Sequence, residues 1–451
     1  MRNLVIVGGG EAGFISAITA KKTNPRVNIT LINDSKEFYS PCALPFVISN
    51  EVGIEDIVDD LEEMCRESGI NCVIDTVVLI DTKNRVVKTK NGHEFRYDSL
   101  IIATGGTPFI PKIPGIELDG VHTLKTIEDA RRIMEVIKGV KNAVVIGGGA
   151  IGVEISAALR KRNLNVTLVE ICEHLLPKAL DPEFSAIVER KLSENGINLL
   201  LNSKVDEIIG ENRVDSVIVN GDEIKAEIVV IGTGVIPRVE LVRDCGIEIF
   251  GRGIKTDGFM RTNIENVYAA GDCVDSRSLL TGKLMLSQLA TTALRHAMTA
   301  GTNAVGGYAT FEGVLNSMLL KVFDIEIGRN GLTENDAREN EIETITGVAR
   351  GTTRSHYFPG SKEILVKLIF NELNRSIIGA QIIGGEGVAG KIDLIAFAIV
   401  NNARIEDLIK LKYCYTPSSA PPRNVIVLAA ENARRKLQRR EEERKRKFER
   451  I

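Results

Sequence analysis

Short apolar runs that end in glycine-rich turns recur along the chain. Residues 4–7 and 143–146 are apolar at every position, which is the pattern of strands buried in a parallel sheet. Each run is followed by a glycine triplet, a segment that predicts a helix, and a second strand at 28–32 or 165–170. This order predicts two dinucleotide-binding folds in one chain, each built on a parallel sheet.

The rest of the pattern predicts an α/β protein whose last third changes in character. There, apolar and polar residues alternate, which is typical of a sheet with one exposed face. The expected elements are a helix over 52–68, strands within 71–90, buried strands at 100–103 and 229–231, a helix over 288–304, sheet segments at 315–327 and 364–382, and a helix over 392–401.

The turn after the first strand has the spacing G-x-G-x-x-G, formed by Gly8, Gly10 and Gly13. Gly8 allows the tight turn, Gly10 lets the backbone approach a pyrophosphate, and Gly13 permits close packing of helix on strand. Phosphates then lie at the N-terminus of the helix, where backbone N–H groups favour anions. Because the motif lies between a strand and a helix, it predicts a bound dinucleotide.

The ribose of such a nucleotide is usually held by an acidic residue about 20 positions further on. Here that position is Asn33, and Asp34 follows it. Asn33 can hydrogen-bond a diol, and Asp34 can reach in its place, so the sequence leaves both residues as candidates.

The second turn repeats the spacing at Gly147, Gly149 and Gly152. Glu170 follows Gly152 by 18 residues, at the end of the second strand, which is the expected place for a ribose-binding acid. A carboxylate there accepts from a ribose 2′-hydroxyl and repels a 2′-phosphate, and no arginine follows it closely. This turn therefore predicts a nicotinamide nucleotide site that favours NADH.

A single thiol lies shortly after the first fold begins. Cys42 stands between Pro41 and Pro45, which restrict the backbone on both sides of it. A stiff turn ahead of a helix can present sulfur near the helix N-terminus, where the dipole favours the thiolate. Taken alone, such a cysteine is more often a small buried apolar residue.

Composition narrows the setting. The chain has 451 residues, 26% of them charged and 44% hydrophobic, with a formal net charge of −3, which is ordinary for a soluble globular protein of several domains. This charge gives no reason to expect nucleic acid as a partner, and no apolar run reaches the roughly 18 residues of a membrane span. Seven cysteines without framework spacing and no visible signal peptide lead us to expect a cytoplasmic protein.

Together, these motifs resemble the flavin-dependent pyridine nucleotide–disulfide oxidoreductases over roughly residues 3–425. The resemblance implies that Gly8, Gly10 and Gly13 bind FAD and that the second glycine turn binds NAD(P)H. It rests further on two hinge-like motifs, Ala103-Thr104-Gly105 and Gly232-Thr233-Gly234, on Ala270-Gly271-Asp272, and on Gly331-Leu332-Thr333-Glu334. By this resemblance Thr104 and Gly105 belong to the FAD site, Asp272 holds the ribityl chain, and the protein is a homodimer.

Cys42 indicates the branch of the family. Members that resemble glutathione reductase carry a second cysteine five positions on, where this chain has Val47, and a His–Glu pair near the C-terminus, which is absent here. The chain therefore resembles the single-cysteine branch of NADH oxidases, NADH peroxidases and coenzyme A-disulfide reductases. Glu11 occupies the place of a histidine typical of the oxidases and peroxidases, which weakens the case for peroxide chemistry.

Two further residues match the coenzyme A-disulfide reductases. Lys22 lies after the first helix, where these enzymes bind their ligand with basic residues, and Tyr357 lies in a Tyr-Phe-Pro-Gly phrase. The family's second tyrosine loop keeps Tyr415 and loses its last tyrosine. Cys414, next to it, is either a resolving thiol or a spectator.

The sequence thus predicts five segments and one main function. The segments are 1–115 and 250–315 for FAD, 116–249 for NAD(P)H, 316–430 for dimerisation, and a charged tail at 431–451 that is a solvated helix or a frayed end. Hydride passes from NAD(P)H through FAD to Cys42, which reduces a low-molecular-weight disulfide or a polysulfide, and no metal is expected. The alternatives are an NADH oxidase that reduces O2 at the flavin, and an electron-transfer or redox-sensing subunit that acts on a protein partner.

Overall fold

The computed structural model describes residues 2–448, which divide into two compact units. The first unit comprises the described residues of 1–147, 158–166 and 205–314, and the second those of 148–157, 167–204 and 315–451. The boundary between the units runs through the second glycine turn and its helix. The predicted α/β class is confirmed. Helices and two sheets with parallel pairings make up most of the chain up to about residue 300, together with short antiparallel sheets such as the one within residues 77–96, and a five-stranded antiparallel sheet follows.

A five-stranded parallel sheet forms the core of the first unit, in the order β22-β9-β1-β2-β5. Its central strand is apolar from Leu4 to Val7, and Leu4, Val5 and Ile6 are at most 2% exposed. Helix α1 packs against α7 so closely that a Cβ on Gly301 would lie 2.4 Å from the Ser16 carbonyl oxygen. The strands and helices of this layer are β1 (Asn3–Val7), α1 (Glu11–Thr23), β2 (Asn28–Asn33), α3 (Leu61–Glu67), β5 (Asn71–Ile74), β9 (Ser99–Ile102), β22 (Val267–Ala269) and α7 (Ala290–Ala304).

Smaller elements of the first unit carry its loops and the second parallel sheet. In that sheet β12 pairs with β18, which pairs with β11. The elements are β3 (Glu37–Phe38), η1 (Pro41–Ala43), α2 (Leu44–Ile48), β4 (Asp59–Asp60), β6 (Val77–Asp81), β7 (Val86–Thr89), β8 (Glu94–Arg96), β10 (Gly106–Pro108), β11 (Val121–Thr123), α4 (Ile127–Val136), β12 (Asn142–Ile146), β15 (Val205–Ile209), β16 (Ser216–Val219), β17 (Asp222–Lys225), β18 (Ile228–Ile231), β19 (Val235–Pro237), η2 (Glu240–Val242), β20 (Ile249–Phe250), β21 (Gly253–Ile254), β23 (Ser276–Arg277) and β24 (Leu284–Met285).

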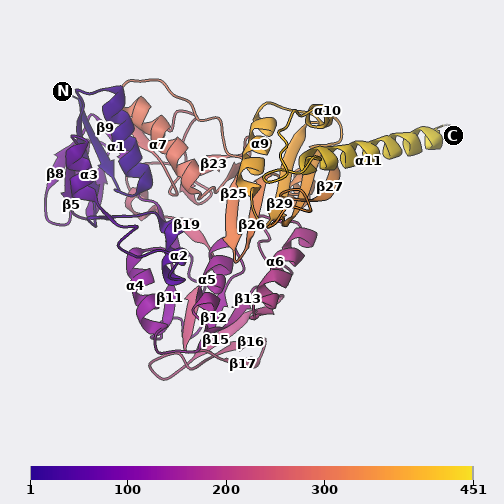
Figure 1. The fold of residues 1–451 in the computed structure, drawn as a ribbon. Coiled ribbons are helices and arrows are strands. Elements are labelled where there is room, and N and C mark those ends of the chain that lie inside the picture. The colour runs from indigo at the N-terminus through magenta and orange to yellow at the C-terminus, as the bar shows by residue number, and fades with distance from the viewer. Residues whose placement is uncertain (1, 449–451) are drawn as a thin grey trace. The chain divides into compact units, whose positions relative to one another are not determined.

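The second unit is organised around an antiparallel sheet in the order β25-β26-β29-β28-β27. Helix α9 packs on β26 and β29, and α11 packs on β27, where a Cβ on Gly347 would lie 1.9 Å from the Ala429 carbonyl oxygen. The elements are α6 (Pro182–Glu194), β14 (Ile197–Leu200), β25 (Met318–Val322), β26 (Ile325–Gly331), α8 (Glu334–Glu339), β27 (Thr344–Thr352), β28 (Glu363–Asn371), β29 (Ile377–Gly384), α9 (Val388–Val400), α10 (Ile405–Ile409) and α11 (Val425–Phe448) (Figure 1). Helix α5 (Ala150–Lys161) and strand β13 (Asn165–Val169) contain residues of both units.

Two expectations need correction or refinement. The predicted helix over 52–68 is wrong in its first half, because α3 begins only at Leu61, where the Asp60 side chain accepts a hydrogen bond from the Glu63 N–H at 3.0 Å and caps the helix. The charged tail is helical through Phe448 but is not simply solvated. Arg440 and Arg444 both pair with the buried carboxylate of Glu372. Residues 449–451 of that predicted tail lie outside the described residues.

Candidate active site

The first glycine turn leaves room for a ligand at the N-terminus of α1. Gly8 has a φ of +102°, and a Cβ there would lie 2.2 Å from the Ala103 carbonyl oxygen. A Cβ on Gly13 would lie 1.8 Å from the Gly8 carbonyl oxygen, so both positions require glycine. Gly10 differs, because a Cβ there meets no atom within 4 Å. Packing within the protein therefore does not require glycine at position 10, and the open space beside it is available to a ligand.

Asn33 lies against this turn, and Asp34 does not. The Asn33 Oδ1 atom accepts a hydrogen bond from the Gly9 N–H at 2.7 Å, and its Nδ2 atom donates to the Ser35 carbonyl oxygen at 2.7 Å. The Asp34 side chain is exposed. Asn33 is thus the residue whose side chain is fixed beside the glycine loop.

The second turn has a matching arrangement around Glu170, which is 6% exposed. One carboxylate oxygen accepts from the Gly148 N–H, and the other accepts from the Cys172 N–H at 2.7 Å. Gly149 accepts the first hydrogen bond of α5 from Val153, and Gly152 is buried. Gly148 meets Glu170 as Gly9 meets Asn33, so the two turns place one polar side chain in the same way.

Each of the two hinge motifs contacts a neighbouring segment of the first unit. Gly147 has a φ of +105°, close to Gly232, in the hinge region of the second turn. In the first turn's region, Thr104 donates to the Arg238 carbonyl oxygen at 2.7 Å, and Gly105 accepts from the Arg238 N–H at 2.9 Å. These contacts tie the first hinge motif to the strand pair β10–β19.

Asp272 forms an ion pair with Lys125 at 3.1 Å, and both side chains are about four-fifths buried. Glu11, in the first glycine turn, lies in their field: burial and the charge of Asp272 raise the pKa of its carboxyl. The predicted ribityl-binding residue is therefore part of a charged cluster at the start of α1 and α4.

Cys42 lies in the short helix η1, which runs directly into α2. Its thiol is exposed, whereas Val47, at the position of the missing second cysteine, is 0% exposed. Pro41 and Pro45 occupy the first turns of the two helices, where proline needs no hydrogen-bond partner for its nitrogen. The alternative interpretation of Cys42, as a small buried apolar residue, is wrong.

The other cysteines of the described residues differ in exposure and in the pKa of their thiols. Burial raises the pKa of Cys245 and Cys273, and burial together with Glu170 raises that of the exposed Cys172. Cys65 is buried beside the half-buried Cys72. Cys414 is exposed, like Cys42.

Comparison with known proteins decides the family. The family model for pyridine nucleotide-disulphide oxidoreductases matches residues 2–300, and the model for the dimerisation domain of these enzymes matches residues 318–424. The chain belongs to this family. As a pyridine nucleotide-disulphide oxidoreductase it is an enzyme that uses FAD and NAD(P)H, and it carries the family's dimerisation domain, which confirms the resemblance seen in the sequence.

Three relatives are similar along nearly the whole chain. The NADH oxidase of Methanocaldococcus jannaschii is 40% identical over 443 residues, which cover 96% of this chain and 99% of the relative. The CoA-dependent NAD(P)H sulfur oxidoreductase of Pyrococcus furiosus is 35% identical and covers 95% and 98%. The solved NAD-dependent persulfide reductase of A. fulgidus has a TM-score of 0.93 at 33% identity, covering 96% of this chain and 83% of that chain.

The remaining predicted residues of this oxidoreductase lie at exposed positions. Lys22 is exposed in the last turn of α1, whereas Lys21 donates to the Val27 carbonyl oxygen at 3.2 Å. In the second unit Tyr357 is 64% exposed, and its hydrogen bond with Tyr415 raises the pKa of the Tyr415 phenol. The loop that lost its last tyrosine therefore still places one phenol beside Tyr357.

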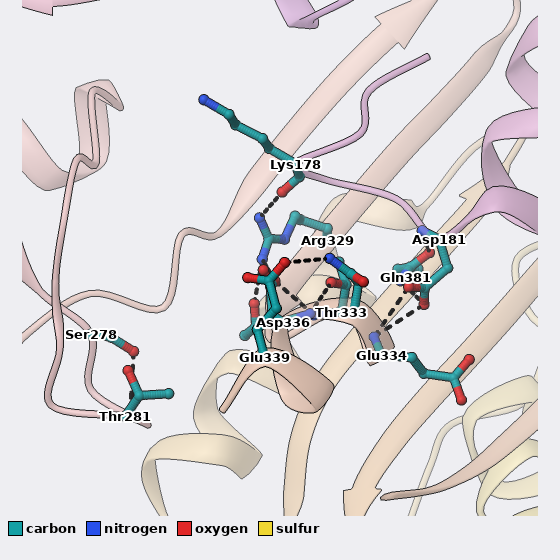
Figure 2. A network of polar contacts seen from close by, with 12 residues as sticks. Lys178, Asp181, Ser278, Thr281, Arg329, Thr333, Glu334, Asp336, Glu339 and Gln381 are labelled. Atoms are coloured by element: carbon teal, nitrogen blue, oxygen red, sulfur yellow. Dashed lines mark hydrogen bonds and ion pairs between the residues drawn. The ribbon is translucent and has the colours of Figure 1, made fainter. Parts of the chain in front are cut away.

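Three carboxylates of the second unit lie close enough together to hold a metal ion: Asp181, Glu183 and Glu334. The ammonium of Lys367, which is 1% exposed, already donates hydrogen bonds to all three. Figure 2 shows Asp181 beside Gln381 and the backbone of Glu334, next to Arg329. A buried cation thus balances this cluster.

Sequence reasoning missed Lys125 of the site, and it missed Glu154 of α5 as an acid with a raised pKa. Lys125, the partner of Asp272, follows a short strand and carries no motif of its own. Glu154 is an acid among the apolar neighbours Val153 and Ile155 of α5, and burial raises its pKa to about 7. An acid inside a buried helical run was the signal available for Glu154. Among the described residues, no helix is long and apolar enough to cross a membrane.

Proposed function

We propose that this oxidoreductase reduces a low-molecular-weight disulfide, persulfide or polysulfide of a coenzyme A-like thiol, with Cys42 as its redox-active group. The observation that carries the proposal is the exposed Cys42 thiol at the start of a proline-bracketed helix, with buried Val47 where a second thiol would be needed. Two of the relatives support it, because they are named as a CoA-dependent sulfur oxidoreductase and a persulfide reductase.

On this proposal the two glycine turns hold the two nucleotides. Gly10 provides open space for the FAD pyrophosphate, and Asn33, rather than Asp34, holds the FAD ribose. When bound, FAD takes hydride from NAD(P)H and supplies two electrons to the thiol site. The residues assigned to FAD are Gly8, Gly10, Gly13, Asn33, Thr104, Gly105 and Asp272, and those assigned to NAD(P)H are Gly147, Gly149, Gly152 and Glu170.

The chemistry at Cys42 is thiol–disulfide exchange. The Cys42 thiolate attacks one sulfur of the substrate R–S–S–R, the S–S bond breaks, and a Cys42–S–S–R mixed disulfide forms while RS⁻ leaves. The Tyr357 hydroxyl, contributed by the second copy of a homodimer, gives the departing thiolate its proton. Two electrons and one proton then convert the mixed disulfide to the Cys42 thiolate and RSH, so that the net donor is NAD(P)H. Lys22 pairs with a phosphate of the ligand.

The nucleotide preference is for NADH. Both oxygens of Glu170 are fixed by backbone N–H groups, which hold its charge where a 2′-phosphate would lie. The following residues, Ile171, Cys172 and Glu173, are exposed and offer no cation to such a phosphate.

A second candidate function is the reduction of O2 at the flavin. The relative named NADH oxidase, at 40% identity, supports it. In that case Cys42 is secondary, because the flavin can meet O2 without a thiol.

One set of variants separates the two functions. NADH oxidation is measured with coenzyme A disulfide, polysulfide or O2 as the acceptor, for wild type, Cys42→Ser and Cys414→Ser. We expect Cys42→Ser to keep FAD and its reduction by NADH, to keep O2 consumption, and to lose disulfide turnover by orders of magnitude. The control Cys414→Ser should match wild type if Cys414 is a spectator. Disulfide reduction by Cys42→Ser at the wild-type rate would refute the proposal and leave the oxidase.

A further inference from the structure

The segment that carries Cys42 is attached by an ion pair on each side. Before it, the Glu37 carboxylate and the Arg131 guanidinium form a two-pronged contact with N–O distances of 2.6 and 3.0 Å. After it, the Glu51 carboxylate pairs with Lys161 at 2.6 Å and accepts from the Ser49 hydroxyl at 2.8 Å. Helix η1 and helix α2 lie between these two points.

Both partner cations lie on helices of the inserted nucleotide-binding region. Arg131 is on α4, and Lys161 ends α5, the helix that begins at the second glycine turn. Helix α2 also lies directly against α4. The Cys42 segment is thus attached through its two acids to two helices that follow strands of another sheet.

A third contact strengthens the first attachment. The Tyr39 phenol lies at the start of α4: burial raises its pKa, and a hydrogen bond with the Ile127 backbone opposes that rise. Two residues earlier in the chain, the Lys125 ammonium pairs with Asp272 at 3.1 Å. One short segment, 125–131, therefore contacts both the predicted flavin-binding acid and the Cys42 loop.

We propose that the Glu37–Arg131 and Glu51–Lys161 pairs position the Cys42 thiol for reaction. The inference rests on the proposed role of Cys42 and adds Arg131 and Lys161 as positioning residues that never touch substrate. A stiff attachment at both ends fixes where η1 begins, and with it the distance from the thiol to the reacting sulfur and the helix dipole that favours the thiolate.

We expect the two ion pairs to contribute little to folding, which makes the inference testable. The exposed fractions of the paired side chains are 45% and 23% for Arg131 and Glu37, and 32% and 42% for Lys161 and Glu51. Ion pairs at such exposure contribute about 1 kcal/mol or less to stability. The protein with either pair removed should therefore fold and retain FAD.

The test compares Arg131→Met, Lys161→Met and the double variant with wild-type holoenzyme. The matched control is Lys138→Met, which removes a 2.6 Å ion pair with Glu135 of α4; Lys138 lies two residues past the end of that helix. The first readout is the alkylation rate of Cys42 by iodoacetamide as a function of pH, followed on its own peptide by mass spectrometry. The second is steady-state reduction of coenzyme A disulfide, and the third is the rate of flavin reduction by NADH.

We expect the double variant to lose about tenfold or more in disulfide turnover, mainly in kcat, and to show a shifted pH profile of Cys42 alkylation. Flavin reduction by NADH should stay within about twofold of wild type. Arg131→Lys, which keeps the charge but loses the two-pronged contact, should fall between wild type and Arg131→Met. If a Met variant loses FAD, Arg131→Lys decides the question with the same readouts.

A double variant whose alkylation profile and turnover both match wild type would overturn the inference. Because alkylation needs no acceptor, it separates this inference from the proposed function. If Cys42→Ser still reduced disulfides while the alkylation profile shifted in the double variant, the proposed function would fail and the positioning role would stand.

Discussion

The buried cation of the second unit allows a prediction of stability. Lys367 lies on β28, is 1% exposed, and donates to Asp181, Glu183 and Glu334, with 2.7 Å to the Asp181 Oδ2 atom. Burial alone would lower the pKa of the Lys367 ammonium, but the three carboxylates outweigh it and the pKa is raised. The ammonium is therefore charged at neutral pH. Lys367→Met keeps an unbranched side chain of similar length and removes this charge.

The size of the effect follows from which carboxylates can reach water. Glu183 and Glu334 are 55% and 35% exposed and can turn outward, whereas Asp181 is 3% exposed and cannot. Removing one partner of a buried ion pair costs about 3–5 kcal/mol, and the two mobile acids favour the lower value, about 3 kcal/mol. In a unit of this size, that is a loss of about 6–12 °C in melting temperature.

The assay is thermal unfolding of holoenzyme from pH 7 to pH 10. The pKa of the Lys367 ammonium is raised, so the stability it contributes is fully present below the unfolded value of about 10.4 and is lost only as the pH rises through the folded value. The deficit of Lys367→Met should therefore stay the same across this range. Lys367→Met with Asp181→Asn should recover most of the loss, and the exposed Lys321→Met is the control. Melting within 2 °C of wild type at pH 7, or a deficit that shrinks between pH 7 and pH 10, would refute this reasoning.

Two further predictions concern the glycine turns. Gly10→Ala should leave the melting temperature of the apoprotein unchanged, because its Cβ meets no atom within 4 Å, and it should weaken FAD binding by at least about tenfold, because a pyrophosphate would occupy that space. The control is Gly139→Ala, whose Cβ also meets no atom within 4 Å. Equal FAD affinities of the two variants in a titration would contradict the assignment. Glu170→Ala should lower the ratio of kcat/KM for NADH to that for NADPH by about tenfold, because it removes both the ribose acceptor and the charge that repels a 2′-phosphate. Both values are measured with the same acceptor, and an unchanged ratio would count against the role of Glu170.

The sequence predicted the elements best where one physical requirement acts alone. Buried parallel strands need apolar residues at every position, and the strands β1 and β12 begin and end within a residue of the predicted runs. Residues 52–60 failed because their polar and apolar pattern suits a helix, while the Asp60 cap and the pairing of β4 with β3 set the start of α3 instead. Such a cap and a two-residue strand leave almost no periodic signal.

The candidate site was predictable only as far as its residues share a motif. Gly8, Gly13 and Glu170 follow from spacing, because the turn and the strand ends fix them relative to one another. Lys125 and Arg131 do not, because an ion pair across 147 or 94 residues depends on the fold that brings its partners together. The choice between Asn33 and Asp34 also depends on the fold, because only the structure shows that the Gly9 N–H donates to the Asn33 side chain.

The two turns differ in the side chain that meets the glycine loop, an amide at Asn33 and a carboxylate at Glu170, and that difference bears on how each nucleotide is held. Asn33 uses one lone pair of its amide oxygen on the Gly9 N–H and one amide N–H on the Ser35 carbonyl oxygen, so a ribose hydroxyl meets the one acceptor and one donor site left on a neutral group. Glu170 offers a full negative charge with lone pairs to spare, and hydrogen bonds to charged groups are about twice as strong as neutral ones. On the proposed roles, the ribose contact therefore contributes more to NADH binding than to FAD binding. Tight retention of FAD must then come from the rest of its length: the α1 N-terminus, the open space at Gly10, and the charged pair of Asp272 and Lys125.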